Sequence, residues 1–224
     1  NKAIDFESNI LGEANTRSSK LRGLLQLFQE VRLTDAIGQL IDVGDLYNQL
    51  LYIFAEEAGK KINNVLAPTE VVSLITKLID GNRKNACLCD PASGSGTLLI
   101  EVGKKMGIRG TDIYGQEVNW NLYALTKMNL MLNGFKGATF LWGDSLRSPK
   151  LLDHGGLKKF DIVVSVPPFA DKWASEEAYD DFYRRFKYGI PPKSQVTWAY
   201  ISHILASLRN DGQAVVVVPV GVLF

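Results

Sequence analysis

A glycine-rich turn between an apolar run and a helical stretch constrains the fold of this chain more than any other feature. Residues 86–90 read as a buried strand, and Asp90-Pro91-Ala92-Ser93-Gly94-Ser95-Gly96-Thr97 leads from it into a helix over 96–106. Glycine permits positive φ and lets the backbone approach a ligand closely. In doubly wound sheets a nucleotide-like ligand lies at the carboxyl end of the first strand. A lone G-x-G is weak evidence, but this order of acid, proline, small residues and two glycines is more specific.

Strand and helix patterns alternate from residue 85 onward. The run 213–220 is rich in valine, which is typical of a strand buried on both faces. This alternation predicts an α/β fold with a mainly parallel sheet and helices on both faces. The expected strands are 86–90, 112–117, 139–142, 160–165 and 213–220, and the expected helices are 96–106, 121–132 and 195–208.

Residues 1–80 read as a helical segment that precedes this sheet. Apolar residues recur at intervals of three and four between Leu21 and Val31, and again from Val43 to Ala58. Pro68 can occupy the first turn of a further helix that ends near Ile79. We therefore expect a helical N-terminal segment over 1–80 and an α/β domain over 81–224. Because the sequence stops directly after the last expected strand, we expect this domain to be incomplete at its C-terminus.

Composition and charge narrow the classes of function. With 25 Lys and Arg against 24 Asp and Glu, the formal net charge is +1. A domain that grips duplex DNA alone usually has a clear basic excess. The balanced charge therefore argues against a chain that holds duplex DNA without help from other parts or partners. We see no apolar run of membrane-spanning length and no signal-peptide pattern, so we expect a cytoplasmic protein without a membrane partner. Cys87 and Cys89 would share one face of a strand and read as reduced core thiols, not metal ligands.

Three further groups of residues lie at the end of an expected strand or just after one. Glu117 can accept hydrogen bonds from both hydroxyls of a ribose, or it can stabilise the N-terminus of the next helix. Asp144 can accept from an adenine amine or cap its own turn. In Val166-Pro167-Pro168-Phe169 the prolines fix the backbone and the phenylalanine offers a face for stacking a base, although the segment can also be a stiff loop.

These motifs, in this order, resemble those of the gamma-class amino-methyltransferases, and specifically the modification subunits of type I restriction-modification systems. The resemblance covers nearly the whole chain and includes Tyr188-Gly189-Ile190-Pro191-Pro192-Lys193. It implies a Rossmann-like fold that uses S-adenosylmethionine to methylate N6 of an adenine flipped out of double-stranded DNA. It also implies a DNA specificity subunit, and further a restriction subunit, as partners.

The resemblance assigns roles to particular residues. It places catalysis in the tetrad formed by Val166, Pro167, Pro168 and Phe169, and it implies no metal. Cofactor binding is implied for the residues Asp90, Pro91, Ala92, Ser93, Gly94, Gly96, Glu117, Asp144 and Pro68.

Two departures from the family pattern leave other hypotheses open. The resemblance implies a catalytic asparagine at position 166, and the valine there has no acceptor for the adenine amine. Losing one positioned polar group costs roughly 10²–10³ in rate. The aromatic-Thr-Pro element of the family is Leu66-Ala67-Pro68 here. A second hypothesis is therefore a catalytically inactive subunit for DNA binding or complex assembly, and a third is methylation of RNA, protein or small-molecule amines.

The loop that follows the tetrad also permits two interpretations. Arg184, Arg185 and Lys187 alternate with aromatic residues, and this pattern is typical of segments that grip a nucleic-acid strand. A solvated loop fits equally well, because acidic residues stand close by. Tyr200 and His203 on the expected helix 195–208 read as structural.

Overall fold

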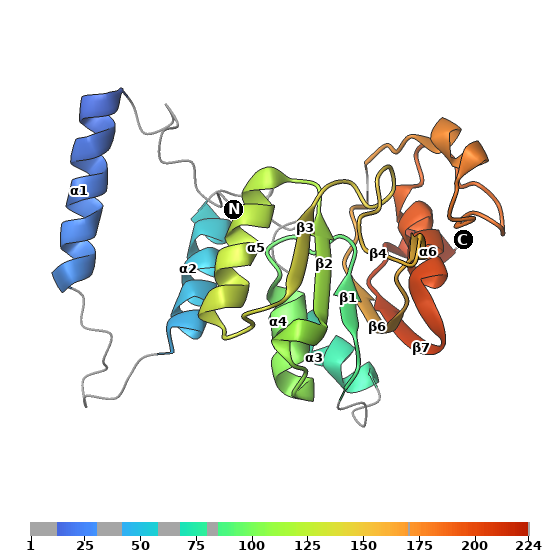
Figure 1. Cartoon of the computed structure of the whole chain (residues 1–224), viewed down its shortest axis with the longest axis horizontal. Coiled ribbons are helices and arrows are strands. Elements are labelled where there is room, and N and C mark those ends of the chain that lie inside the picture. Colours follow the sequence, from blue (N-terminus) through green and yellow to red (C-terminus); the bar gives the residue numbers. More distant parts are fainter. Residues whose placement is uncertain (1–12, 31–41, 58–67, 80–84, 170, 224) are drawn as a thin grey trace.

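The structure of the chain is a computed structural model that describes residues 13–30, 42–57, 68–79, 85–169 and 171–223. Five strands form its central sheet in the order β3-β2-β1-β6-β7, and every neighbouring pair is parallel (Figure 1). The strands are β1 (Leu88–Asp90), β2 (Ile113–Glu117), β3 (Thr139–Trp142), β6 (Phe160–Ser165) and β7 (Leu208–Val216).

The order of the strands creates a switch point at the centre of the sheet. From β1 the chain continues outward to β2 and β3, and it then returns to place β6 and β7 on the opposite side of β1. Loops that leave β1 and β6 therefore diverge at their carboxyl ends. Such switch points are the usual ligand crevices of open α/β sheets.

Helices cover both faces of the sheet because side chains of successive strand residues point to opposite faces. Ile162 packs in one core with Leu99 of α4 (Thr97–Met106) and Leu130 of α5 (Trp120–Leu132). Val163, its neighbour on β6, packs in a second core with Ile204 of α6 (Val196–Ser207). The predicted two-sided coverage of the sheet is therefore confirmed.

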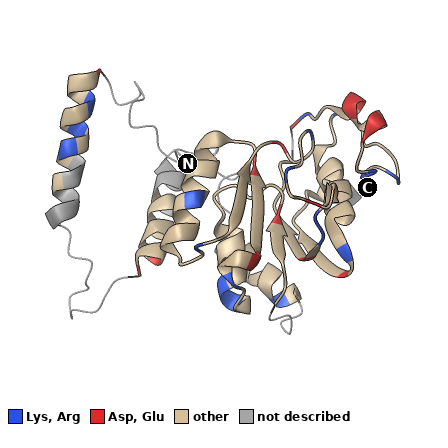
Figure 2. Cartoon of the chain, in the orientation of Figure 1, with Lys and Arg blue, Asp and Glu red and all other residues tan. Residues whose placement is uncertain are grey.

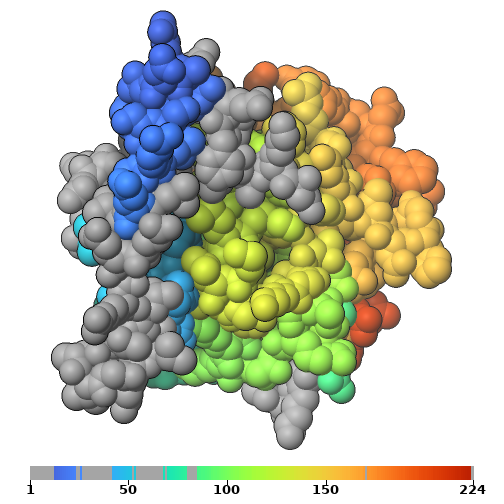
Figure 3. Space-filling view, turned by 60° about the vertical axis from the view of Figure 1, so that its left-hand side comes forward, coloured from blue at the N-terminus to red at the C-terminus, as the bar shows by residue number. Residues whose placement is uncertain are grey.

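In the described part of the chain before the sheet, three helices are present, namely α1 (Ala14–Glu30), α2 (Val43–Glu57) and α3 (Thr69–Leu78). α2 packs against α5, where the Tyr47 hydroxyl donates to the Leu125 carbonyl at 3.3 Å, and the two helices lie side by side in the space-filling view (Figure 3). α3 packs against α4, where Lys105 Nζ donates to Thr76 Oγ1 at 2.8 Å. The division of the chain at residue 80 stays a prediction. None of the helices in the described ranges is long and apolar enough to cross a membrane.

The final strand differs from the sequence prediction. β3 and β6 occupy the predicted residues, but β7 spans Leu208–Val216 instead of 213–220. It pairs only with β6, at the edge of the sheet, and none of its residues is fully buried. The prediction of a fully buried strand was wrong because a valine-rich run does not reveal whether a strand has one neighbour or two. Residues 220–223 form the short helix η5 (Val220–Leu223).

The remaining short elements in the described ranges were not predicted from the sequence. These are the hairpin of β4 (Leu152–Asp153) and β5 (Gly156–Leu157) and the 3-10 turns η3 (Gly110–Asp112) and η4 (Ser175–Asp180).

Candidate functional site

The glycine-rich turn after β1 is held in place by two side chains of α5. Thr126 Oγ1 donates to the Gly94 carbonyl at 2.6 Å, and Asn129 Nδ2 donates to the Ser95 carbonyl at 3.2 Å. Gly96 has a φ of 75°, and a Cβ at this position would lie 2.3 Å from Thr126 Cγ2. Only glycine therefore permits this close approach of the turn to α5.

Asp90 is buried at the switch point and links the two strands that meet there. Its Oδ1 accepts hydrogen bonds from the Ala92 backbone N–H at 2.9 Å and from Ser165 Oγ at 2.8 Å, so it joins the ends of β1 and β6. Burial raises the pKa of Asp90 to about 7, although the hydrogen bonds from Ala92 and Ser165 act in the opposite direction. Asp90 shapes the turn and does not line the cavity described below.

Glu117 lies at the end of β2 and faces the turn. Its Oε2 accepts from the Gly94 N–H at 2.9 Å, and its Oε1 accepts from the Asn119 N–H at 2.7 Å. Burial raises the pKa of Glu117, and the backbone hydrogen bonds oppose this rise. Because each carboxylate oxygen has two lone pairs, both oxygens can still accept a hydrogen bond from a ligand hydroxyl.

Asp144 follows β3 and caps its own turn. Its Oδ1 accepts from the Leu146 N–H at 2.8 Å and from the Arg147 N–H at 3.1 Å. Ser145 Oγ donates to the Pro91 carbonyl at 2.6 Å and so ties this loop to the one after β1. The turn-capping interpretation is therefore correct for one carboxylate oxygen.

A cavity of about 220 Å³ brings the predicted groups together. Ala92, Gly94 and Glu117 line it together with the whole tetrad from Val166 to Phe169. A neighbouring cavity of about 510 Å³ is lined in part by Asp144. The two cavities have shared walls, formed by Val118, Pro168, Asp171 and Tyr200.

The tetrad forms one wall of the smaller cavity. Val166 is half-buried and packs against the main core. The Pro168 carbonyl accepts from Thr197 Oγ1 at 3.2 Å, which fixes the loop to α6. Phe169 is exposed by 43%, so part of its side chain is free to contact a ligand.

Not every predicted site residue lies at this cavity. Pro68 is exposed at the N-terminus of α3 and lines neither cavity, while Leu66 and Ala67 lie outside the described residues. The remaining predicted residues shape the turn after β1 but line neither cavity. These are Asp90, Pro91, Ser93 and Gly96.

Tyr200 is a site residue that the sequence did not reveal. It is buried and lines both cavities, and its pKa is raised, first by burial and then by nearby carboxylates such as Asp144 and Glu117. Its spacing of four from Val196 shows that it shares the buried face of α6. Only the strand order places that face beside the cavities.

The loop after the tetrad is part solvated and part structural. Arg184 and Lys187 are exposed, and Lys187 Nζ lies 4.7 Å from the ring centre of Tyr188. Arg185 is buried, so it does not belong to an exposed basic surface.

Known proteins resemble this chain in sequence and in structure. Residues 40–224 match the N-6 DNA methylase family. The chain is 30% identical to the methylase subunit of the type I restriction enzyme MpnII of Mycoplasma pneumoniae, over 93% of this chain and 41% of the relative. It is also 30% identical to the HindI methylase subunit of Haemophilus influenzae, over 86% of this chain and 45% of the relative.

Two solved structures share the fold. The methyltransferase subunit of a type I restriction-modification system from Streptococcus thermophilus gives a TM-score of 0.77 at 25% identity, over 99% of this chain and 48% of that one. A protein assigned as a class I S-adenosylmethionine-dependent methyltransferase from Listeria monocytogenes gives 0.69 at 18% identity, over 94% and 62%. The predicted Rossmann-like fold is confirmed. The chain spans less than half the length of the MpnII and HindI methylase subunits.

Proposed function

The chain belongs to the N-6 DNA methylase family, and we propose that it is the S-adenosylmethionine-binding core of a type I modification subunit that methylates N6 of adenine in DNA. One observation carries the proposal. A single cavity is lined both by Gly94 and Glu117 and by the tetrad from Val166 to Phe169. A cofactor held by Gly94 and Glu117 would therefore share this cavity with a base held by the tetrad.

The residues present fit this cofactor. Glu117 offers two buried carboxylate oxygens, which suit the two hydroxyls of a ribose. Ala92 and Gly94 form a wall with little side chain, so a ligand can lie close to the backbone. Asp144 lines the adjoining cavity and would contact the adenine part. When bound, S-adenosylmethionine supplies a methyl group activated on a sulfonium.

The tetrad would bind and orient the target adenine. Phe169 has a partly exposed side chain, whose ring can stack on the base. Thr197 already uses one of the two lone pairs of the Pro168 carbonyl, so we assign the acceptor for the adenine amine to the Pro167 carbonyl instead. Holding the amine at a fixed place accelerates transfer because it removes the entropy cost of orientation. Flipping the base costs unstacking energy, which contacts with DNA must supply.

DNA, a specificity subunit and a restriction subunit are the partners that we propose. The relatives are methylase subunits of type I restriction enzymes, which supports an assembly of several subunits. The net charge of +1 supports it as well, because a domain that grips duplex DNA alone usually has a clear basic excess. Figure 2 shows Lys and Arg at positions spread over several helices and strands of the ribbon. Much of the grip on phosphates would then come from other parts of the assembly.

Val166 favours a second candidate function. Its side chain is aliphatic and lines the cavity where an acceptor for the amine would be useful. A subunit that binds the cofactor and DNA but transfers no methyl group would keep the turn and Glu117 and would tolerate this valine. We rank it second because the rest of the cavity wall retains the groups that methyl transfer needs.

Transfer of tritiated methyl groups distinguishes the two candidates. The full-length protein, assembled with its specificity subunit, would be incubated with labelled S-adenosylmethionine and duplex DNA, and the DNA would then be digested to nucleosides. We expect the label in N6-methyladenine. Binding of both ligands without incorporation would establish the non-catalytic subunit, and label in another nucleoside would refute the assignment to adenine.

A further inference from the structure

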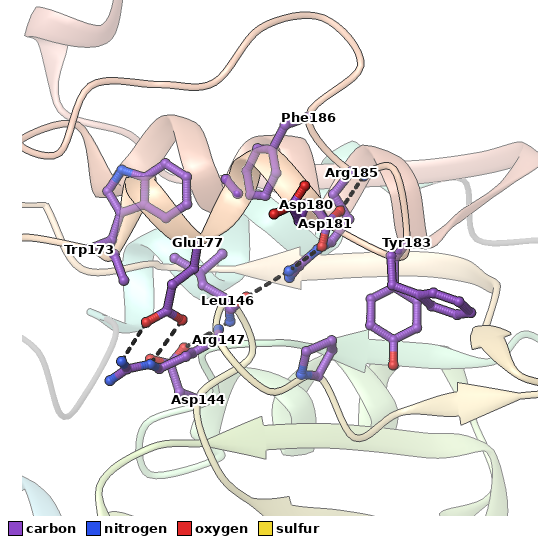
Figure 4. Close-up of a pocket in the computed structure, with 14 residues that line it drawn as sticks. Asp144, Leu146, Arg147, Trp173, Glu177, Asp180, Asp181, Tyr183, Arg185 and Phe186 are labelled. Carbon is purple, nitrogen blue, oxygen red and sulfur yellow. Dashed lines mark hydrogen bonds and ion pairs between the residues drawn. The ribbon is translucent and has the colours of Figure 1, made fainter.

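Arg185 is a buried guanidinium whose five N–H groups all have acceptors. Its Nε and one Nη2 proton are donated to Asp181 Oδ1, at 3.0 and 2.7 Å. The other Nη2 proton goes to the Leu146 carbonyl at 2.7 Å. Nη1 donates to the Ser145 carbonyl at 2.9 Å and lies 3.2 Å from His203 Nδ1. Figure 4 shows Arg185 between the loop at Leu146 and the segment that carries Asp181.

The neighbours of Arg185 are arranged to hold it in this place. Asp181 is as buried as Arg185, and its Oδ2 also accepts the Arg185 backbone N–H at 2.6 Å. His203 presents Nδ1 toward the guanidinium, so this nitrogen must carry the lone pair and Nε2 the proton. One charge is therefore neutralised by one carboxylate, and the neutral imidazole completes the set of acceptors.

The two carbonyls that Arg185 binds belong to the residues directly after Asp144. Ser145 Oγ binds the Pro91 carbonyl from the opposite side of the loop. The Asp144 loop is thus fixed between the turn after β1 and the guanidinium of Arg185. Fixing two successive carbonyls leaves the backbone at Asp144 little freedom to move.

We propose that Arg185 is a positioning residue, which holds Asp144 where it can contact the adenine part of S-adenosylmethionine. This inference rests on the proposed function, because it needs the cofactor in the two adjoining cavities. It also links the loop after the tetrad to cofactor binding. Arg185 belongs to that loop, and its contacts reach the loop after β3 and helix α6.

A double-mutant cycle in the full-length protein tests the proposal. Arg185→Lys keeps the charge but cannot reproduce the fork of five donors. Calorimetric titration with S-adenosylmethionine should give a Kd about 10-fold higher, the scale of one lost hydrogen bond to a charged group. In an Asp144→Asn background the same substitution should change Kd by less than about two-fold, because the positioned group is already gone.

Arg209→Lys is the matched control, because Arg209 pairs with Asp161 at 3.1 Å on the rim of the sheet and lines neither cavity. Its Kd should equal that of the wild type. A structural role without positioning would lower Tm but leave Kd unchanged in Arg185→Lys, or would give the same change in both backgrounds. Either result overturns the inference.

Three further outcomes complete the test. If Arg185→Lys does not fold, Asp181→Asn weakens the anchor at constant volume, and it should raise Kd in the wild-type background alone. If wild-type protein binds no S-adenosylmethionine, the proposed function fails, and the inference fails with it. If the wild type binds and Glu117→Ala weakens binding while both anchor variants do not, the inference alone is wrong.

Discussion

Replacing His203 by asparagine would isolate one titration within the buried network around Arg185. Burial, and next the charge of Arg185, lower the pKa of His203 from 6.5 to about 3. Asparagine keeps an oxygen acceptor for the guanidinium but has no proton to gain. When the pH dependence of the two proteins is compared, the contributions of all other titrating groups, which they share, therefore cancel.

The sign follows from which state binds the proton. Above pH 6.5 the imidazole of His203 is neutral in the folded and the unfolded chain. The contribution of the neutral His203 to the free energy of unfolding is then fully present. As the pH falls from 6.5 toward about 3, the unfolded chain takes up a proton that the folded chain does not, and this stability is progressively lost. At pH 5 the loss is 1.5 pH units times about 1.36 kcal/mol, or about 2 kcal/mol.

Urea denaturation at pH 7 and pH 5 measures this loss. The free energy of unfolding of the wild type should fall by about 2 kcal/mol more than that of His203→Asn between the two pH values. Parallel pH dependence in the two proteins would refute the reasoning, because it would mean that His203 is protonated in the native state or free to titrate.

Two other substitutions probe the turn after β1 and the lining of the smaller cavity. Gly96→Ala should destabilise the fold by at least about 1 kcal/mol more than Gly107→Ala. Both positions have positive φ, but only at Gly96 would an added Cβ clash with Thr126. Equal urea midpoints for the two variants would contradict this clash. Val166→Asn should raise methyl transfer to DNA by roughly 10-fold or more, because it adds an acceptor beside Pro167; an unchanged rate of tritium incorporation would show that position 166 does not limit the chemistry.

The elements with strong local signals could be predicted from the sequence. The buried run 160–165 and the turn from Asp90 to Thr97 follow from composition and glycine spacing, and both lie where they were expected. The first half of β7 could not be predicted, because Arg209-Asn210-Asp211-Gly212, which follow Leu208, have the composition of a turn. They nevertheless belong to a strand that pairs with β6 at the edge of the sheet.

The supporting residues of the site depend on contacts between distant segments. Glu117 and Gly94 could be assigned to one site because each lies at the carboxyl end of a strand or just after it, and their hydrogen bond at 2.9 Å agrees with that assignment. Arg185 could not, because in sequence it stands in a loop among exposed charges. Its burial arises only when Ser145, Leu146 and His203 converge on it from two other elements.

Calorimetric titration with S-adenosylmethionine tests the central claim most directly. The claim is that the cofactor lies against Glu117 in the cavity that the tetrad closes. We predict saturable binding by the full-length protein and a Kd at least about 5-fold higher for Glu117→Ala, which removes hydrogen bonds to a charged acceptor. Asp153→Ala, which removes an exposed acid of the β4–β5 hairpin, should bind like the wild type. Equal Kd values for Glu117→Ala and the wild type would contradict the account.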